Sequence, residues 1–353
     1  MRIKAPRVYH QEKGLLEQIG EYIYPVSEKF FIICEKKISD QIGSEIKKSL
    51  ETAEIEWKKI VFEGVCTEEL AMQYANECME AECEAILGIG ENNVLDLAKA
   101  AAHYADVPVL VVPTVASSNA PCSSIVGLFK NAHFDKRLRL GNCPDMVLVD
   151  SEMITAAPAC YLAAGMADAI ATYLENKILF QSELEGRIKK GTIPATVMAV
   201  SKESYNSIMA YGQKAFEDIQ NHICSDEVEK IIEANIYLSG IGFENGGLAA
   251  AHSIAKGMTH LGKLDLLHGE CVSIGILAQM IMSGEDSEEF QMMKKFLCSL
   301  KLPVCLSDLG VENLREIAET IAKPASSAYV SNPALPFSMR YEMIAGALLA
   351  LEN

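Results

Sequence analysis

The sequence predicts an α/β domain with a parallel sheet, followed by an all-helical domain. The chain has 353 residues, and because a typical domain has roughly 150, two domains are expected. In the first half, short β-branched runs alternate with helical patterns, as in a parallel sheet covered by helices on both faces. After about Pro158 the strand signal disappears. We therefore expect an α/β domain at 1–158 and a helical domain at 159–353.

Each element of the first domain is expected from a local pattern. Apolar runs predict strands at Lys29–Cys34, Ile55–Glu63, Ala85–Gly90, Val107–Thr114 and Met146–Asp150. Helical periodicity predicts helices at Glu69–Glu82 and Val94–Tyr104. This arrangement is Rossmann-like, and such sheets bind ligands at the carboxyl ends of their strands.

The second domain is rich in Ala, Leu, Met and Glu with helical spacing from Cys160 to Leu351. Helix breakers divide it, for example Gly191–Pro194 and Gly240–Gly247. We expect the binding site in a cleft between this domain and the first.

Composition excludes several classes of partner. Asp plus Glu number 48 against 31 Lys plus Arg, a formal net charge of −17 that repels nucleic acid. No apolar run of about 18 residues predicts a membrane span, and the polar N-terminus does not resemble a signal peptide. Eleven Cys without a CxxC pair are typical of thiols in a reducing compartment, so we expect a cytoplasmic protein.

Three polar residues lie in otherwise apolar helical stretches. They are Asp168 in AAGMADAIATYL, His252 in GGLAAAHSIAKGM and His268 in HGECVSIGILAQMIM. Each one taken singly is explained by an ordinary hydrogen-bond partner. Taken together, one carboxylate and two imidazoles form a metal-ligand set with coordination positions open to water or substrate. Their spacing alone does not bring them together, so the fold must do so.

The segment Ile86–Ala102 predicts a strand, a turn with Gly88 and Gly90, and a helix with Asn92 or Asn93 as its N-cap. The free amides at such a helix start suit a pyrophosphate. Glu35, which follows a strand, is placed to accept from a ribose hydroxyl, which favours NAD over NADP. The alternative is that the glycines serve only the turn and that Glu35 begins a charged loop.

Polar residues also crowd the loop that follows the strand at Val107–Thr114. They are Thr114, Ser117, Ser118, Asn119, Ser123 and Ser124. Such a cluster is typical of turns. After a central strand it is equally suited to wrap a cofactor.

Long stretches of the chain are similar to one known family. They include IIEANIYLSGIGFENGGLAAAHSIAKGMTH (Ile231–His260), HGE (His268–Glu270), PTVASSNAPCS and PDMVLVDSEMITAAPACYLAAGMADAIATYLE. From about Lys29 to its end the sequence resembles the glycerol dehydrogenase branch of the iron-containing alcohol dehydrogenase superfamily, with dehydroquinate synthases as more distant relatives. The resemblance implies a dehydroquinate synthase-like architecture.

The resemblance also implies two cofactors. It implies Zn²⁺ held by Asp168, His252 and His268; iron-type members carry a further His four residues after the Asp, where this chain has Thr172. The acidic residue that polarises the substrate falls on Asn119, which with the three ligands completes the expected catalytic set. The implied NAD contacts are Glu35, Gly90, Asn92, Asn93, Val94, Leu95, Asp96, Thr114, Val115, Ala116, Ser117, Ser123, Ile125 and Phe129.

The chain departs from the pattern of these relatives at two places. In place of GGGKT the chain has Gly90, Glu91, Asn92, Asn93 and Val94, so two glycines and a Lys are lost and a carboxylate is added near the expected phosphates. Asn119 can hydrogen-bond a hydroxyl but cannot act as a base. The changed turn puts tight NAD binding in question, and Asn119 puts glycerol as the substrate in question.

We therefore expect a homo-oligomeric, zinc-dependent oxidoreductase that transfers a hydride between NAD and a small polyol, glycerol or a related vicinal diol. One alternative is a different or phosphorylated hydroxy substrate. The other is a metal-binding homologue with impaired nucleotide binding.

Overall fold

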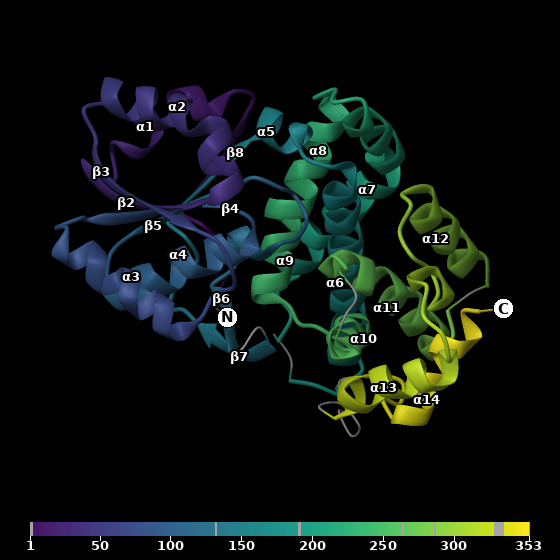
Figure 1. Cartoon of the computed structure of the whole chain (residues 1–353). Helices are drawn as coiled ribbons and strands as arrows, with labels where there is room; N and C mark the ends of the chain where they lie inside the picture. The colour runs from purple at the N-terminus through teal and green to yellow at the C-terminus, as the bar shows by residue number, and fades with distance from the viewer. Residues whose placement is uncertain are drawn as a thin grey trace. The chain divides into compact units, whose positions relative to one another are not determined.

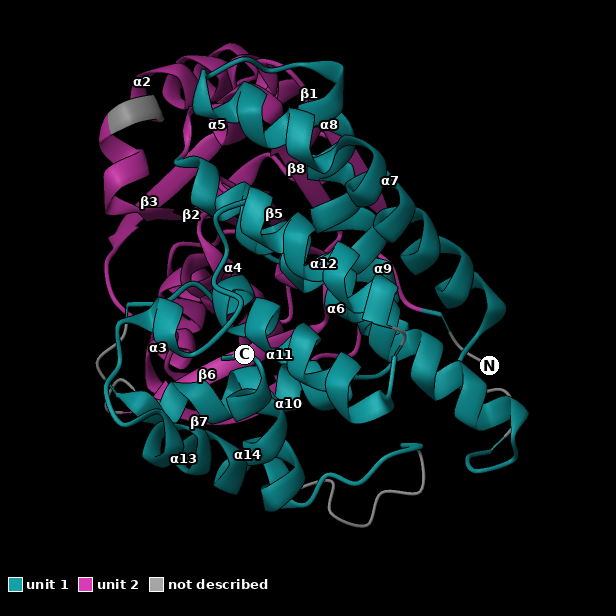
Figure 2. Cartoon of the chain, turned by 90° about the vertical axis from the view of Figure 1, so that its right-hand side faces the viewer, with its two compact units in different colours: residues 1–3, 117–119, 158–353 teal, residues 4–116, 120–157 magenta. Residues whose placement is uncertain are grey.

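The computed structural model describes residues 3–130, 133–189, 192–262, 265–285, 287–327 and 335–352. The chain divides into two compact units (Figure 2). The α/β unit comprises Lys4–Ala116 and Ala120–Ala157, and the helical unit comprises Met1–Ile3, Ser117–Asn119 and Pro158–Asn353. The short segment Ser117–Asn119 thus belongs with the helices although it follows a strand.

The α/β unit contains a six-stranded sheet of order β1-β8-β5-β4-β2-β3, and all its pairings are parallel. Its strands are β1 (Val8–Glu12), β2 (Lys29–Glu35), β3 (Glu56–Phe62), β4 (Ala85–Gly90), β5 (Val109–Pro113) and β8 (Met146–Asp150). The inner strands β4, β5 and β8 are buried along their whole length, as expected where helices cover both faces of a sheet. The predicted fold class is confirmed for this part of the chain.

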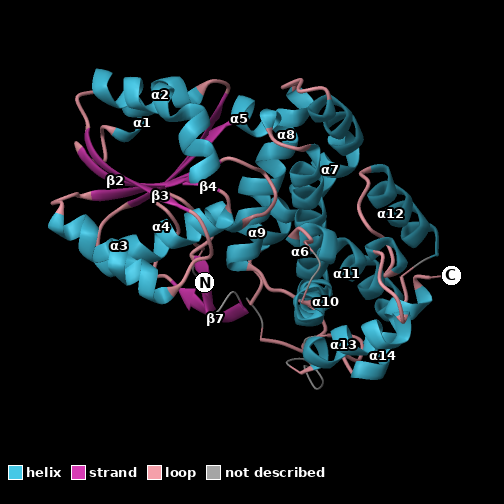
Figure 3. Ribbon diagram, viewed as in Figure 1, coloured by secondary structure: helices cyan, strands magenta, loops and turns pink. Residues whose placement is uncertain are grey.

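Helices cover the two faces of this sheet (Figure 3). On one face lie α1 (Ile19–Ile23) and α2 (Lys36–Thr52), whose apolar side chains join those of β2 and β4 in a core cluster that includes Ile46, Leu50 and Leu87. On the other face lie α3 (Glu68–Glu80) and α4 (Asn92–Ala105). The short α5 (Ser151–Ala156) follows β8.

Three strands of this unit were not predicted from the sequence. The edge strand β1 has the sequence VYHQE, with no fully buried residue. The strands β6 (Ile125–Lys130) and β7 (His133–Arg139) form a separate antiparallel hairpin. Because the exposed β7 is mostly charged, its pairing with β6 stabilises it rather than burial.

The helical unit contains no strand among its described residues (Figure 1). Its elements are α6 (Ala159–Leu184), α7 (Ala195–Gln220), α8 (Asp226–Glu233), a π-helical turn (Ala234–Leu238), α9 (Ser239–Asn245), α10 (Ala250–Met258), α11 (His268–Ser283), α12 (Ser287–Ser299), α13 (Leu314–Ser326) and α14 (Tyr341–Ala350). In the described part of the chain, no helix is both long and apolar enough to span a membrane.

Small residues allow α11 to approach two neighbouring helices closely. A Cβ added at Gly269 would overlap the backbone carbonyl of Ala164 on α6, and one at Gly275 would overlap that of Ala251 on α10. The backbones of three helices therefore meet almost directly, which a larger side chain would prevent. This packing determines where the candidate ligands on α6, α10 and α11 lie.

Seven of the eleven cysteines are buried, among them Cys66 and Cys122. Burial raises the pKa of the Cys66 thiol to about 12, so the group is neutral at ordinary pH. These residues act as small hydrophobic side chains.

Candidate functional site

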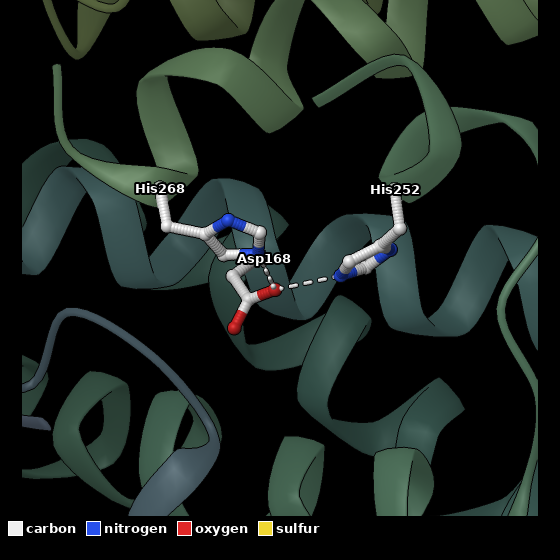
Figure 4. A group of neighbouring side chains, drawn as sticks. All are labelled: Asp168, His252 and His268. Carbon is white, nitrogen blue, oxygen red and sulfur yellow. Dashed lines mark hydrogen bonds and ion pairs between the residues drawn. The ribbon is translucent and has the colours of Figure 1, made fainter. Parts of the chain in front are cut away.

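The three polar residues of the apolar helices converge on one point of the helical unit (Figure 4). Asp168 extends from the middle of α6, His252 from α10, and His268 is the first residue of α11. One candidate ligand atom from each lies within 4.8 Å of the others. His252 Nε2 is 3.0 Å from Asp168 Oδ1, and His268 Nε2 is 3.7 Å from the same oxygen.

The site is closed on one side and open on the other. Asp168 and His252 are buried, whereas the His268 side chain is 51% exposed. The exposed imidazole gives a small molecule access to the converging atoms. A site with protein ligands on one side and an open approach on the other has the form of a catalytic rather than a structural metal centre.

Neighbouring charges and hydrogen bonds keep the buried Asp168 and His252 in their charged forms. Burial alone would lower the pKa of His252, but the neighbouring Glu175 and Asp168 carboxylates raise it to about 10. Burial raises the pKa of Asp168, but the hydrogen bond from His252, the charge of His268 and the backbone N–H of Asn119 hold it below its ordinary value. In the absence of a cation, the proton on His252 neutralises part of this cluster.

The three side chains fit a divalent cation. Donor atoms around one Zn²⁺ lie roughly 2 Å from it, so any two are on the order of 3–4 Å apart. The observed spacing needs only small side-chain shifts to reach this geometry. One carboxylate oxygen and two imidazole nitrogens are donors that zinc accepts.

Asn119 lies beside the Asp168 carboxylate. Its backbone N–H donates to Asp168 Oδ2 at 3.2 Å. Its side-chain Nδ2 donates to the hydroxyls of Thr172 and Ser239, each at 3.4 Å. The side chain is buried and uses its N–H groups, which an acidic residue does not have.

Thr172, at the position where iron-type relatives are expected to carry a His, also belongs to this network. Its hydroxyl is buried and donates to the backbone carbonyl of Asp168, one helical turn earlier. It accepts from Asn119 and lies 3.4 Å from the Ser239 hydroxyl. Thr172 therefore links the Asp168 backbone to the Asn119 side chain. Ser239 was not anticipated from the sequence because nothing local distinguishes it.

Glu175, which is fully buried on α6, was not predicted from the sequence. Its Oε1 accepts from the backbone N–H of His252 at 3.0 Å, and its Oε2 lies 2.6 Å from His252 Nδ1. Glu175 follows Asp168 by about two helical turns, so both lie on the same face of the helix. Like Asp168, Glu175 is a carboxylate in an apolar part of the helix, so the same sequence signal could have found it.

In the α/β unit, the turn between β4 and α4 needs a glycine at residue 90. Gly90 has φ +153°, and a Cβ there would lie 2.9 Å from Glu35 Cβ and 3.0 Å from Val94 Cγ2, so only glycine fits. Glu35 ends β2 beside this turn, and its Oε2 accepts from the Glu91 N–H at 3.2 Å. Both residues thus lie at the carboxyl edge of the sheet.

One detail of this turn differs from the expected one. Glu91, and not Asn92 or Asn93, is the N-cap of α4, because its carbonyl already accepts from the amides of Val94 and Leu95. Asn92 and Asn93 are the first two helical residues, and Asn93 Oδ1 accepts from the Cys66 N–H at 3.5 Å. The Glu91 side chain makes no capping hydrogen bond to this helix.

The remaining expected cofactor residues differ in what they offer a ligand. The Thr114 hydroxyl is buried, at the end of β5, and has no hydrogen-bond partner within the part of the chain that the structure describes. Val94, Leu95, Val115 and Ala116 bury their side chains. Ser117 belongs to the helical unit. Phe129, on β6, packs edge-on against Phe134 with ring centroids 6.1 Å apart.

Asp96 and the buried Lys99 bind the loop that leads into β6. Asp96 Oδ1 is 2.7 Å from Lys99 Nζ, and its Oδ2 accepts from the Gly127 N–H at 2.7 Å. Lys99 Nζ also donates to the carbonyls of Ala120, Ser123 and Ile125. The carboxylate of Asp96 thus binds Gly127 and Lys99, and Lys99 in turn holds the backbone of Ser123 and Ile125. The sequence did not single out Lys99.

Comparison with known proteins identifies the family. Residues 6–151 match the iron-containing alcohol dehydrogenase family. The chain is 33% identical over 354 residues to the glycerol dehydrogenase of Escherichia coli O6:H1, an alignment that covers 99% of this chain and 96% of that protein. The chain belongs to the iron-containing alcohol dehydrogenase family. The predicted family is thereby confirmed.

Two further relatives support this assignment. The glycolaldehyde reductase of Halobacterium salinarum is 29% identical over 353 residues, which cover 99% of this chain and 96% of that protein. A crystal structure of a probable glycerol dehydrogenase from Sinorhizobium meliloti 1021 has a TM-score of 0.89 at 28% identity and covers 99% of this chain and 98% of that one. As a member of the iron-containing alcohol dehydrogenase family, the protein is an oxidoreductase with the dehydroquinate synthase-like fold.

Proposed function

We propose that this alcohol dehydrogenase family member uses Zn²⁺ and NAD to oxidise a small polyol, glycerol or a related vicinal diol, to the carbonyl compound. The observation that supports it most directly is the convergence of Asp168, His252 and His268 on one open-sided point. The glycerol dehydrogenase that aligns with almost the whole chain supports the polyol as substrate.

In this proposal the three converging side chains hold the metal. Asp168 supplies one anionic oxygen, and the two imidazoles supply neutral nitrogens once His252 has lost its extra proton. A bound Zn²⁺ supplies the positive charge that makes the hydroxyl group of an alcohol acidic. The exposed side at His268 admits the polyol, and the buried amide and hydroxyls of Asn119, Thr172 and Ser239 fix the Asp168 side of the site.

The α/β unit would bind NAD, which serves as the hydride acceptor. Gly90 and the amides at the start of α4 would receive the pyrophosphate, and the Thr114 hydroxyl has a hydrogen bond to give. The remaining expected contacts around Ser123, Ile125 and Phe129 would border the same ligand. Glu35 at the end of β2 would disfavour a 2′-phosphate by like charge, so NAD is proposed rather than NADP.

The experiment is metal removal and restoration. The protein is stripped with a chelator, Zn²⁺ is added back, and NADH formation is followed with glycerol and with 1,2-propanediol. We expect activity only with metal, and we expect Asp168→Ala to lose both bound zinc and activity. A protein that binds no zinc, or that oxidises no diol when loaded, would contradict the proposal.

A second candidate function rests on the turn at Gly90–Val94. Glu91 places a carboxylate at the N-terminus of α4, and Asn93 stands where relatives are expected to carry a Lys. Both changes weaken phosphate binding. The second candidate is therefore a metal-binding homologue with impaired nucleotide binding. NADH fluorescence titration separates the two: micromolar saturation supports the dehydrogenase, and no binding at millimolar concentration supports the homologue.

The identity of the substrate requires a separate activity test. A panel of diols, hydroxyaldehydes and phosphorylated polyols at fixed NAD distinguishes glycerol from a different or phosphorylated hydroxy compound. The glycolaldehyde reductase among the relatives makes short hydroxyaldehydes a necessary part of that panel. We further propose a cytoplasmic homo-oligomer, which sedimentation and cell fractionation would test.

A further inference from the structure

Glu175 and His252 form a buried two-point contact. Glu175 Oε1 accepts from the backbone N–H of His252 at 3.0 Å, and Oε2 lies 2.6 Å from ring atom Nδ1. The contact determines both the position of the residue on α10 and the rotation of its ring. On the other edge of the ring, Nε2 faces Asp168 Oδ1 at 3.0 Å (Figure 4).

The first turn of α10 explains why a carboxylate is stable in this interior position. The amides of Ala250 and Ala251 donate to Gln279 Oε1 at 3.0 and 3.1 Å, and the next amide, that of His252, donates to Glu175. Two side chains from other helices thus satisfy donors that a helix start leaves open. The positive end of the α10 dipole also favours a negative charge at this position.

The chemistry of the contact determines which ring nitrogen carries a hydrogen. An ionised carboxylate can only accept, so Nδ1 must be the donor in the 2.6 Å contact. In the neutral imidazole the lone pair then lies on Nε2. This is the atom that belongs to the cluster with Asp168 and His268.

We propose that Glu175 is a positioning residue that keeps His252 in the Nδ1–H tautomer and directs its Nε2 lone pair to the metal. The inference rests on the proposed metal site and adds a residue outside the three ligands. Partners of this kind orient ligating histidines and increase their basicity, and their loss typically costs 10–100-fold in metal affinity. A merely structural Glu175 would affect folding stability alone.

The variant Glu175→Gln tests the tautomer with little change in volume. Its amide oxygen can still accept from the His252 backbone N–H, but its NH₂ group then faces Nδ1 and favours hydrogen on Nε2. We expect Zn²⁺ affinity, measured by competition with a chromophoric chelator, to fall about 10–100-fold. The visible spectrum of the Co²⁺-loaded protein should change as well.

The matched control is Gln279→Met, which removes the other side-chain cap of α10 without contact to the imidazole. It should lower the melting temperature and leave metal affinity within about threefold of the wild type. Equal losses of affinity in both variants, or unchanged affinity in Glu175→Gln, would overturn the proposal.

A direct measurement on the wild type covers the case in which Glu175→Gln does not fold. In ¹⁵N-histidine NMR spectra of the zinc-loaded protein, His252 should carry hydrogen on Nδ1, and zinc should shift Nε2. Zinc on Nδ1 would refute the positioning role and leave the metal site intact. A wild type that binds no zinc would refute the proposed function, and this inference with it.

Discussion

Gly269 lies directly against the backbone carbonyl of Ala164, so closely that any Cβ at residue 269 would overlap that oxygen. Gly269 follows His268, and Ala164 lies one helical turn before Asp168 on α6. The contact between Gly269 and Ala164 therefore determines how far His268 lies from Asp168.

Gly269→Ala should accordingly affect both the fold and the site. The added methyl must push α11 away from α6, at a cost of about 1–3 kcal/mol in unfolding free energy. Because His268 moves with α11, zinc affinity should fall as well. Chemical denaturation and zinc titration measure the two effects. Gly346→Ala on α14 is the control, since a Cβ there meets nothing within 4 Å, and it should be neutral or slightly stabilising. Wild-type behaviour of Gly269→Ala would contradict the packing argument.

The metal-free protein should lose stability as pH rises from about 6.5 toward 10. The pKa of His252 is raised from 6.5 to about 10 by Glu175 and Asp168 against the opposing effect of burial. A group whose pKa is higher in the folded state binds its proton more tightly there. Its stabilisation is complete below the unfolded pKa and disappears as pH approaches the folded one.

Chemical denaturation of the metal-free protein at pH 6.5, 7.25 and 8 tests whether stability falls as pH rises. This pH range lies below the ordinary pKa of cysteine, so thiol ionisation does not interfere. His252→Gln should flatten the dependence. With saturating zinc the trend should reverse, because the metal displaces the proton and binds more tightly at higher pH. A chelated wild type that gains stability over this range would contradict the assignment.

Asn119→Asp should destabilise the metal-free protein. The variant loses the N–H groups that now reach Thr172 and Ser239, and it buries a second carboxylate beside Asp168. We expect a loss of about 1–3 kcal/mol. Zinc should recover more stability in the variant than in the wild type, because a cation offsets the added charge. Melting temperatures with and without zinc provide the measurement, and an equal zinc effect in both proteins would argue against a cation at this point.

Restoring the phosphate-binding character of the α4 turn should strengthen NAD binding. Glu91→Gly with Asn93→Lys removes one negative charge and adds one positive charge near the expected pyrophosphate. At about 1 kcal/mol for each charge, NADH affinity should rise roughly tenfold or more, and less at high salt. Glu312→Lys, an equal charge change on the exposed surface of the helical unit, should leave affinity unchanged. An unaltered Kd in the double variant would show that NADH does not use this turn.

Structural features that depend only on residues close together in the sequence could be predicted from it. The strands β4 and β8 have the predicted limits, because a buried strand needs a short apolar run ended by turn residues. The metal-ligand candidates were recognised because polar groups in apolar helices are costly without a partner. The edge strand β1 was missed because its pairing with the distant β8 stabilises it. The strand β7 was missed because its charged sequence has no apolar pattern and its pairing with β6 stabilises it.

Tertiary structure alone decided which groups meet. Asp168 and His252 lie on different helices, and their contact depends on the close backbone approaches at Gly269 and Gly275. The same packing brings Glu175 to His252, and the loop after β5 brings the Asn119 amide to Thr172. No local pattern encodes such distances, because they result from the way whole helices pack through small residues.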